Sequence, residues 1–308
     1  MAAAPFVYDA KYSAIAIAYK NQQFIADNVF PRVPVGSKAF KYLQFPSEEV
    51  FTVVDTKIPR KGTPNVVEFH GQELDSSCED YGLDDDIPND DINNAPEGYD
   101  PVASATEWLA NLVLLDRELR VANLLFNPAN YASSKTLTLS GNSQFSDFVN
   151  SDPLEIISDA MDSCIMRPNT MTIGRAAFSK LRRHPKVVKA VNGNSGDSGV
   201  ASRQAMAELF EVDNIFVGES FLNSAKKGQN AVMQRVWGKH ISLTYIDKQA
   251  TNQRGVTFGL TAQYQNRVSG RQDIDLGLNG GTKVRVGEQV KELIVAKDAG
   301  FFLQNVVA

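Results

Sequence analysis

Residues 104–126 read SATEWLANLVLLDRELRVANLLF and contain the clearest secondary-structure pattern in the chain. Apolar residues recur at steps of four, three, four, three and four, at Trp108, Leu112, Leu115, Leu119, Ala122 and Phe126. Ser104 and Glu107 have the spacing of a capping box. Asp100-Pro101 offers an earlier start, and Asn127-Pro128 ends the pattern. The stretch therefore predicts one long helix of about 34 Å with a single apolar face.

The region before this helix predicts a long β-hairpin. Strand-like runs at residues 40–45, 50–54 and 66–69 flank a turn-forming link, residues 58–64 (IPRKGTP). Three cations lie at or near the tip of this hairpin, namely Lys57, Arg60 and Lys61. The stretch that follows, residues 73–100, is acidic and broken by glycine and proline, which predicts a loop.

The net charge of −5 hides a strong asymmetry. Residues 62–116 contain fourteen acidic residues and no Lys or Arg, so the rest of the chain has nine more bases than acids. Such a distribution suits contact between copies of the chain, or with a polyanion, better than a pocket for a small substrate. A solvated acidic loop is the alternative interpretation of the charge.

Short strands and helices follow the long helix. Strands are predicted at residues 136–139, 171–174, 215–218, 231–237, 241–246, 256–264, 283–286, 290–296 and 301–307, and helices at 152–167, 176–181, 186–191 and 202–210. At the N-terminus, residues 14–19 fit a short helix or a strand. Residues 29–35 form an extended ribbon because two prolines exclude a helix there. The predicted fold class is α+β, with strands toward both ends of the chain.

Composition restricts the class of protein further. The chain has 308 residues and 43% hydrophobic residues, enough for a large core in one large domain or two ordinary ones. No run approaches the roughly 20 apolar residues of a membrane span, and the N-terminus lacks a secretory signal. Two cysteines, Cys78 and Cys164, cannot form a disulfide framework. We expect a soluble protein made in a reducing compartment.

Each candidate catalytic or metal-binding motif in the sequence lacks residues that its chemistry requires. His70, His184 and His240 are far apart and outside any zinc-binding pattern. The Asp84–Asp91 segment lacks the ligand spacing of a calcium loop, so it predicts adventitious cation binding only. Residues 196–199 (GDSG) look like a serine-protease nucleophile segment, but no histidine upstream has the matching context. We therefore predict no enzyme activity, no cofactor and no dedicated metal site.

A basic cluster lies between residues 175 and 189. It comprises Arg175, Lys180, Arg182, Arg183, His184, Lys186 and Lys189. A helical cluster of this kind allows weak, sequence-independent contact with phosphates. It also fits a solvated helix face, or a partner for the acidic segment.

The order of segments resembles the HK97-like major capsid protein of tailed bacteriophages. Four local strings strengthen the likeness: residues 25–35 (IADNVFPRVPV), 214–218 (NIFVG) followed by 223–225 (NSA), 236–239 (VWGK) and 295–303 (VAKDAGFFL). The resemblance implies an N-terminal arm at 1–36, an E-loop region with an acidic loop at 37–98 and a peripheral domain with a spine helix at 99–168. It further implies an axial domain at 169–262 and strands that return to the peripheral domain at 263–308.

The same resemblance implies a function and partners. Copies of the chain would assemble as pentamers and hexamers into an icosahedral shell around double-stranded DNA, with portal, scaffolding and decoration proteins as further partners. The shell would form in the bacterial cytoplasm and become the virion head. The alternatives are an encapsulin-like shell around cargo protein, and a serine hydrolase that uses Ser198.

Physical reasoning also predicts that copies of the chain assemble, independently of the resemblance to a family. We expect the N-terminal ribbon and the hairpin to leave apolar side chains uncovered until neighbouring copies dock on them. Opposite charges would give these contacts their direction. The candidate assembly residues are Lys57, Arg60 and Lys61 on the hairpin and Asp84, Asp85, Asp86, Asp90 and Asp91 in the acidic segment.

Overall fold

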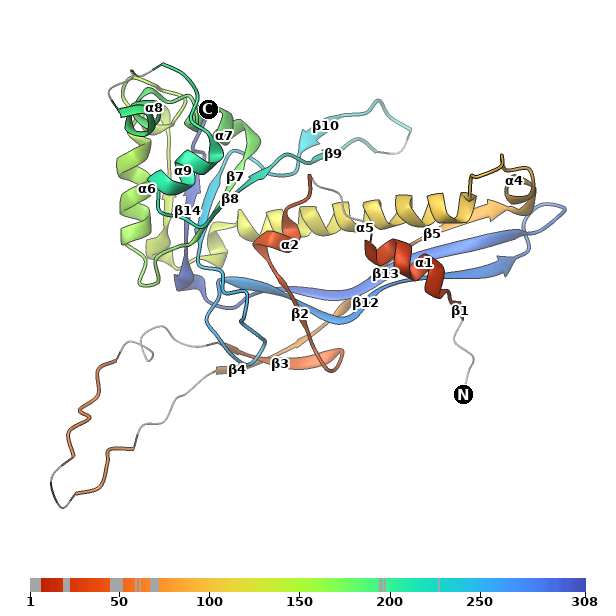
Figure 1. Cartoon of the computed structure of the whole chain (residues 1–308), viewed down its shortest axis with the longest axis horizontal. Coiled ribbons are helices and arrows are strands. Elements are labelled where there is room, and N and C mark those ends of the chain that lie inside the picture. Colours follow the sequence, from red (N-terminus) through yellow and green to blue (C-terminus); the bar gives the residue numbers. More distant parts are fainter. Residues whose placement is uncertain are drawn as a thin grey trace.

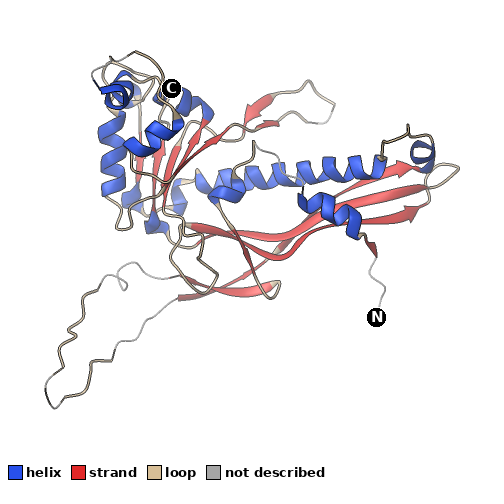
Figure 2. Cartoon of the chain, in the orientation of Figure 1, coloured by secondary structure: helices blue, strands red, loops and turns tan. Residues whose placement is uncertain are grey.

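The structure is a computed structural model and describes residues 7–18, 23–44, 52–58, 60, 62–66, 72–193, 196, 198–226 and 228–308. An elongated part carries the long helix α5 (Pro101–Leu125), and a lobe with its own sheet lies at one end of it (Figure 1). Figure 2 shows helices and strands mixed in both parts, which confirms the predicted α+β class. None of the helices in the described ranges is long and apolar enough to cross a membrane.

The elongated part is a sheet covered on one face by α5. Its strands follow the order β1 (Val7–Tyr8), β12 (Gly259–Ile274), β13 (Gly281–Ile294) and β5 (Glu79–Pro88), and β2 (Arg32–Pro34) pairs in parallel with β12. Val284 and Val286 of β13 are fully buried beneath α5 and α1 (Ala10–Ala18). The small helix α4 (Asn89–Asn93) closes the far end (Figure 1).

The lobe contains a second sheet with helices around it. The strand order is β6 (Thr136–Thr138), β14 (Gly300–Gln304), β11 (Ile241–Thr244), β7 (Thr170–Gly174) and β8 (Asn214–Gly218). The surrounding helices are α6 (Pro153–Asp162), α7 (Arg175–Leu181), α8 (Pro185–Asn192) and α9 (Arg203–Leu209). Every residue of β7 is buried. Asp152 caps α6 by accepting hydrogen bonds from the amides of Leu154 and Glu155, as its sequence predicts.

Two projecting hairpins and several short elements complete the fold. β3 (Ala39–Gln44) pairs with β4 (Gln72–Ser77), and β9 (Phe221–Asn223) pairs with β10 (Met233–Arg235). Within the described ranges the remaining elements are α2 (Ala26–Val29) and the short 3-10 helices η1 (Pro128–Asn130), η2 (Ser133–Lys135), η3 (Gly141–Ser143) and η5 (Lys297–Ala299).

The long helix starts at Asp100-Pro101, the earlier of its two predicted starts, and its first half buries a different face from the predicted one. Asp100 is its N-cap and accepts hydrogen bonds from the amides of Val102 and Ala103, both at 3.0 Å. The buried stripe runs along Val102, Ala105, Leu109, Val113, Arg117, Val121 and Leu125. Trp108, the first residue of the predicted apolar face, is 63% exposed. The predicted face is therefore wrong in the first half of the helix, whereas Ala122 is buried and Leu115, Leu119 and Phe126 are half-buried against the core in its second half. The buried polar residues Arg117 and Glu118 interrupt the hydrophobic pattern of the inner face.

The acidic stretch is a loop only over residues 94–100, so the prediction of a loop is wrong for residues 73–93. Residues 72–93 form β4, β5 and α4. The β5 strand is stable despite its acids because it pairs along its whole length with β13, which places cations opposite Asp84 and Asp86. Arg285, for example, is the register partner of Asp84. Opposite charges on facing positions stabilise an antiparallel pair.

Candidate assembly surfaces

The N-terminal ribbon is covered by its own subunit over residues 25–35, so the expectation that it stays uncovered is wrong there. Ile25, Ala26, Val29 and Phe30 are buried in the core at the junction of the two parts. The carboxylate of Glu118, on α5, accepts hydrogen bonds from the amides of Ile25 at 2.9 Å and Ala26 at 2.8 Å. It also accepts one from the indole Nε1 of Trp237 at 2.6 Å. Burial raises the pKa of Glu118 although these donors oppose the shift.

A buried ionic network adds to this attachment. The guanidinium of Arg117 donates to Asp27, to the Phe30 carbonyl at 3.2 Å and to the Thr261 hydroxyl at 2.9 Å. Arg32 donates to Asp27 at 2.7 Å and, through a second nitrogen, to the carboxylate of Glu288 at 2.9 Å. The ribbon is thus hydrogen-bonded to α5 and to the sheet beneath it.

The Asp27 contacts predict a pH dependence. Burial raises the pKa of Asp27, but Arg117 and Arg32 outweigh it and hold this pKa below its ordinary value of 3.8. The carboxylate therefore stabilises the folded subunit above about pH 4, and this contribution is lost as pH falls through the lower, folded-state pKa. We expect Asp27→Asn to lower the melting temperature of the subunit at pH 7 by about 2–4 °C. The gap to the wild type should narrow progressively as pH falls below about 4 when both are followed by circular dichroism.

Asp159→Asn is the matched control for this measurement. Asp159 is an exposed acid on α6, and no ion pair is recorded for it among the described residues. Its substitution should leave the melting temperature unchanged at both pH values. A gap between Asp27→Asn and wild type that persists unchanged at pH 3 would contradict the electrostatic explanation.

The hairpin link projects away from the body as an extended finger, defined here as the described residues 52–58, 60 and 62–66 (Figure 1). The Asn65 side chain donates to the Asp55 carbonyl at 2.8 Å and thereby joins its two sides. Residues 52–54 and 66 form no strand, unlike the prediction, whereas residues 50, 51 and 67–69 and Lys61 lie outside the described part of the chain.

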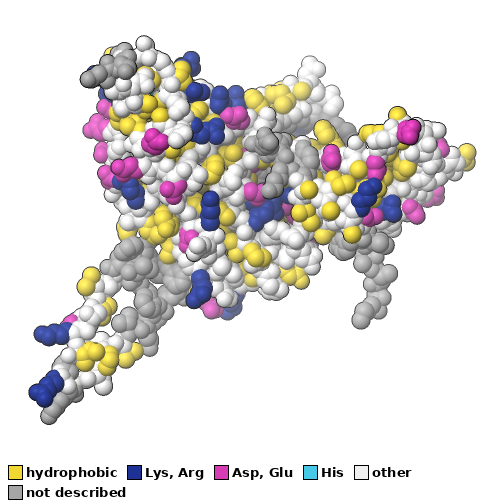
Figure 3. Space-filling view, in the orientation of Figure 1, with side chains coloured by type: hydrophobic (Ala, Val, Ile, Leu, Met, Phe, Trp, Pro, Cys, Tyr) yellow, Lys and Arg dark blue, Asp and Glu magenta, His cyan; other side chains and the backbone are white. Residues whose placement is uncertain are grey.

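The finger exposes apolar side chains and two cations. Val53 is 96% exposed and Val66 is 89% exposed. Lys57 and Arg60 are exposed as well, and no ion pair is recorded for either among the described residues. Figure 3 shows the finger with yellow and dark blue side chains away from the rest of the surface. Exposed valines on a projecting segment favour docking on another surface.

Two of the candidate acids are paired within the subunit. Asp84 accepts two hydrogen bonds from the Arg285 guanidinium, each at 2.6 Å, and this guanidinium holds the pKa of Asp84 below its ordinary value. Asp86 lies 3.4 Å from the ammonium group of Lys283. These carboxylates lie on the face of β5 that is turned away from α5, because side chains alternate along a strand.

The other three candidate acids lie toward the far end of the elongated part. Asp90 accepts a hydrogen bond from the Asn279 side chain at 2.8 Å. Asp85 and Asp91 have no hydrogen bond or ion pair recorded within the described ranges. The structure therefore pairs Asp84 and Asp86 with cations, whereas Asp85, Asp90 and Asp91 have no cation recorded among the described residues.

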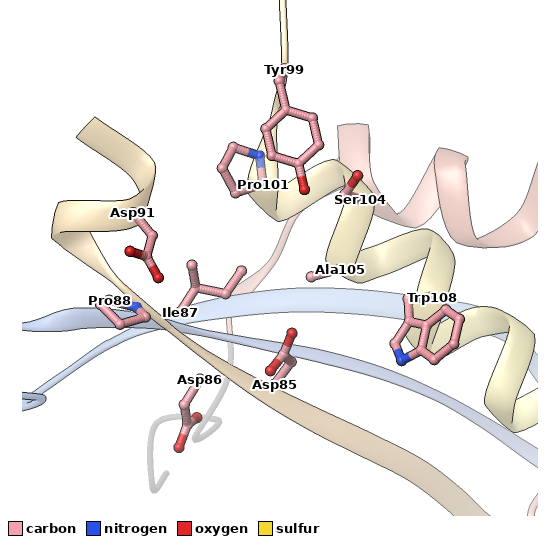
Figure 4. A pocket seen from close by; sticks show the side chains of 10 residues that line it. All are labelled: Asp85, Asp86, Ile87, Pro88, Asp91, Tyr99, Pro101, Ser104, Ala105 and Trp108. Atoms are coloured by element: carbon pink, nitrogen blue, oxygen red, sulfur yellow. The ribbon is translucent and has the colours of Figure 1, made fainter. Parts of the chain in front are cut away.

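Asp85 and Asp91 line an open pocket of about 550 Å³ between β5, α4 and the start of α5. In Figure 4 the carboxylate of Asp85 points toward α5, while Asp86 points away from it on the other side of the ribbon. Trp108 and Tyr99 form aromatic walls of the pocket. The remaining lining residues are Asp86, Ile87, Pro88, Pro101, Ser104 and Ala105.

Other chemical candidates are not assembled into a site within the described residues. His184 contacts the Ser151 hydroxyl at 3.0 Å, and the Nδ1 atom of His240 accepts from the Asn305 amide at 3.0 Å. His70 lies outside the described residues. The described part contains no group of three His, Cys, Asp or Glu residues placed to hold a metal ion. Ser198 is exposed, and no contact with an acid or a histidine is recorded for it there.

Sequence reasoning missed the residues that hold the ribbon. Glu118 and Trp237 are far apart in sequence, and no local pattern links them. It also missed Trp108 and Tyr99 as pocket residues, since Trp108 was assigned to the buried face. The charged pair Arg117-Glu118 lies in the middle of an otherwise apolar stripe of the helix. This pair could have indicated the buried network from the sequence.

A covered N-terminal segment, a long helix on an elongated sheet, a projecting finger and a separate lobe define the HK97-like capsid fold. Two solved structures share this arrangement. A phage-related protein from Bordetella bronchiseptica RB50 superposes with a TM-score of 0.78 at 23% identity, over 98% of this chain and 99% of that one. The capsid of cyanophage P-SCSP1u superposes with a TM-score of 0.55 at 12% identity, over 91% of this chain and 88% of that one.

The sequence comparisons give the family. The major capsid protein of Pseudomonas phage JBD67 is 51% identical over 309 aligned residues, which cover 100% of both chains. Residues 130–266 match the model of the phage major capsid protein E family. The chain belongs to the phage major capsid proteins, the structural subunits of the virion capsid. This assignment favours the capsid interpretation over the encapsulin-like alternative.

Proposed function

We propose that copies of this chain assemble as pentamers and hexamers into a closed icosahedral shell around double-stranded DNA, and that the subunit has no catalytic role. The finger is the observation that carries this proposal. Its valines are exposed although the body of the subunit has a complete core. A neighbouring copy that covers them would gain about 25 cal/mol for each Å² of apolar surface removed from water.

The proposed subunit has the parts that the resemblance implies. Residues 1–36 act as the N-terminal arm, 37–98 as the E-loop region, 99–168 as the peripheral domain with its spine helix, and 169–262 as the axial domain. Residues 263–308 return to the peripheral domain. The long β12–β13 pair supports the return of residues 263–294 to the elongated part, because it lies along α5, whereas β14 lies in the sheet of the lobe.

The proposal includes partners beyond the chain itself. Portal and scaffolding proteins, and a decoration protein, would act with the shell, which would form in the bacterial cytoplasm. DNA would be held by sequence-independent contacts. The basic cluster supports such contacts, since Lys180 and Lys189 have no ion pair recorded in the described part, whereas Arg175 pairs with Glu219 at 2.9 Å.

Electron microscopy of the particle tests the proposal. The protein should sediment with closed shells of uniform diameter when it is produced with its scaffolding partner, and filled heads should contain DNA that resists nuclease. Monomers or small oligomers under every condition would contradict a shell function. Shells that enclose protein and exclude DNA would instead favour the encapsulin-like alternative, and hydrolysis abolished by Ser198→Ala would favour the hydrolase.

A further inference from the structure

The pocket at the far end of the elongated part has the chemistry of a site for a small organic cation. Asp85 on β5 and Asp91 on α4 supply two carboxylates, and no cation is recorded beside either within the described ranges. Trp108 is 63% exposed and Tyr99 is 55% exposed, and both rings line the same cavity (Figure 4). Aromatic faces attract ammonium groups, and they also cover the methylene chains that carry such groups.

Asp85 is on the inner face of β5, which is turned toward α5. Side chains alternate along a strand, so Asp85 lies on the same side as Ile87, which is 8% exposed and packs in the core beneath α5. Asp84 and Asp86 lie on the outer face, and both are paired with cations of β13. Of these three acids, the one with no cation recorded in the described part is therefore the one beside apolar and aromatic groups.

The other end of β5 already holds a cation by the same chemistry. The guanidinium of Arg120 lies 3.6 Å from the centroid of the Tyr81 ring and 3.0 Å from the carboxylate of Glu292. Tyr81 and Asp85 are four residues apart on one strand, so their side chains share a face. Aromatic rings and carboxylates thus meet at both ends of this face. Among the described residues, the chain supplies a cation at only one of these ends.

The two carboxylates and the two rings together select the class of cation. The carboxylates come from different elements, so a ligand with two ammonium groups can pair with both of them. The aliphatic chain between its ammonium groups would lie against Trp108 and Tyr99. Mg²⁺ gains nothing from aromatic walls and keeps several of its waters. The described part also contains no group of three His, Cys, Asp or Glu residues placed to hold a metal ion.

We propose that the pocket formed by Asp85, Asp91, Tyr99 and Trp108 binds a free aliphatic polyamine, a flexible chain with two or more ammonium groups. The bound polyamine neutralises the acidic end of the elongated part. All four residues belong to one subunit, so the site is present in the single folded chain and does not depend on the shell function. A ligand that binds only the folded chain also stabilises it against unfolding.

Titration of the full-length soluble subunit with spermidine tests the site. A chain labelled with ¹⁵N-tryptophan gives two indole signals, from Trp108 and Trp237, and Trp108→Phe assigns them. Spermidine should shift the Trp108 signal with saturation and leave the signal of the fully buried Trp237 in place. At equal ionic strength, Mg²⁺ and the monoamine butylamine should bind at least about tenfold more weakly than spermidine.

Variants test the two parts of the pocket separately by calorimetry. Asp85→Asn/Asp91→Asn should weaken spermidine binding at least about tenfold, because two charged acceptors are lost. Trp108→Ala should weaken it about threefold or more through the loss of the ring. Glu155→Gln/Asp159→Asn is the matched control, because it removes two charges from exposed positions of α6, and it should bind like wild type. Circular dichroism checks that each variant folds.

Four results would overturn the proposal. An unmoved Trp108 signal would show that the pocket binds no polyamine. Equal affinity for Mg²⁺ and spermidine would show attraction by acidic charge alone, as would a control variant weakened as much as Asp85→Asn/Asp91→Asn. Butylamine binding as tightly as spermidine would indicate a site for a single ammonium group, such as a lysine side chain of a polypeptide.

Discussion

Glu118→Ala is expected to lower the free energy of unfolding by about 3–5 kcal/mol and to loosen residues 25–35 from the subunit. The fully buried carboxylate accepts from the amides of Ile25 and Ala26 and from the indole of Trp237. Alanine would leave these donors buried without an acceptor, and each unsatisfied donor costs about 1–3 kcal/mol. The effect is large because one side chain joins the ribbon, the long helix and the segment that carries Trp237.

Urea denaturation of the soluble subunit measures this loss, and hydrogen exchange locates it. The amides of Ile25 and Ala26 should exchange much faster in the variant than in wild type. Glu107→Ala is the matched control, since Glu107 is an exposed glutamate on the same helix with no partner recorded among the described residues. Unchanged exchange at Ile25 together with a stability loss below about 1 kcal/mol would show that Glu118 does not anchor the ribbon.

The ribbon shows where local sequence patterns stop being informative. Prolines correctly predict extended backbone at residues 29–35, because they act on adjacent residues. Whether that backbone is covered depends on Glu118 and Arg117, more than 80 residues away. The presence and approximate length of the long helix were also predictable, because its capping residues and apolar spacing are local sequence patterns. Its buried face was predictable only in the second half of the helix, because Arg117 and Glu118 on the inner face are hydrogen-bonded by distant partners.

The charges of the acidic segment likewise depend on partners that are distant in the sequence. Its composition favours a solvated loop when residues 73–100 are considered alone. Arg285 and Lys283, about 200 residues later, lie opposite Asp84 and Asp86 and convert the segment into a strand. The sequence correctly indicated an acidic surface and a basic hairpin. It could not indicate which acids are paired inside the subunit and which, such as Asp85, have no cation recorded among the described residues.

The glycines at the ends of β7 and β8 make room for the segment that carries Trp237. Gly174 and Gly218 are register partners on these neighbouring strands. A Cβ atom at position 218 would lie 2.0 Å from Cγ of Trp237, and one at position 174 would lie 1.8 Å from the carbonyl oxygen of Gly238. Residues 237 and 238 therefore cross directly over this glycine pair. Their close approach places the Trp237 indole where it reaches Glu118.

Gly174→Ala is accordingly expected to cost about 3 kcal/mol or more of unfolding free energy, since its clash is with backbone and no side chain can rotate away. Thermal unfolding measures the cost, with Gly36→Ala as the control because a Cβ atom at Gly36 meets nothing within 4 Å. In a Trp108→Phe background, Trp237 is the one remaining tryptophan, so its fluorescence reports the local displacement. If Gly174→Ala matched Gly36→Ala in both melting temperature and emission, residues 237 and 238 could not lie against the ends of β7 and β8. The indole–Glu118 hydrogen bond would then lose the steric reason for its position.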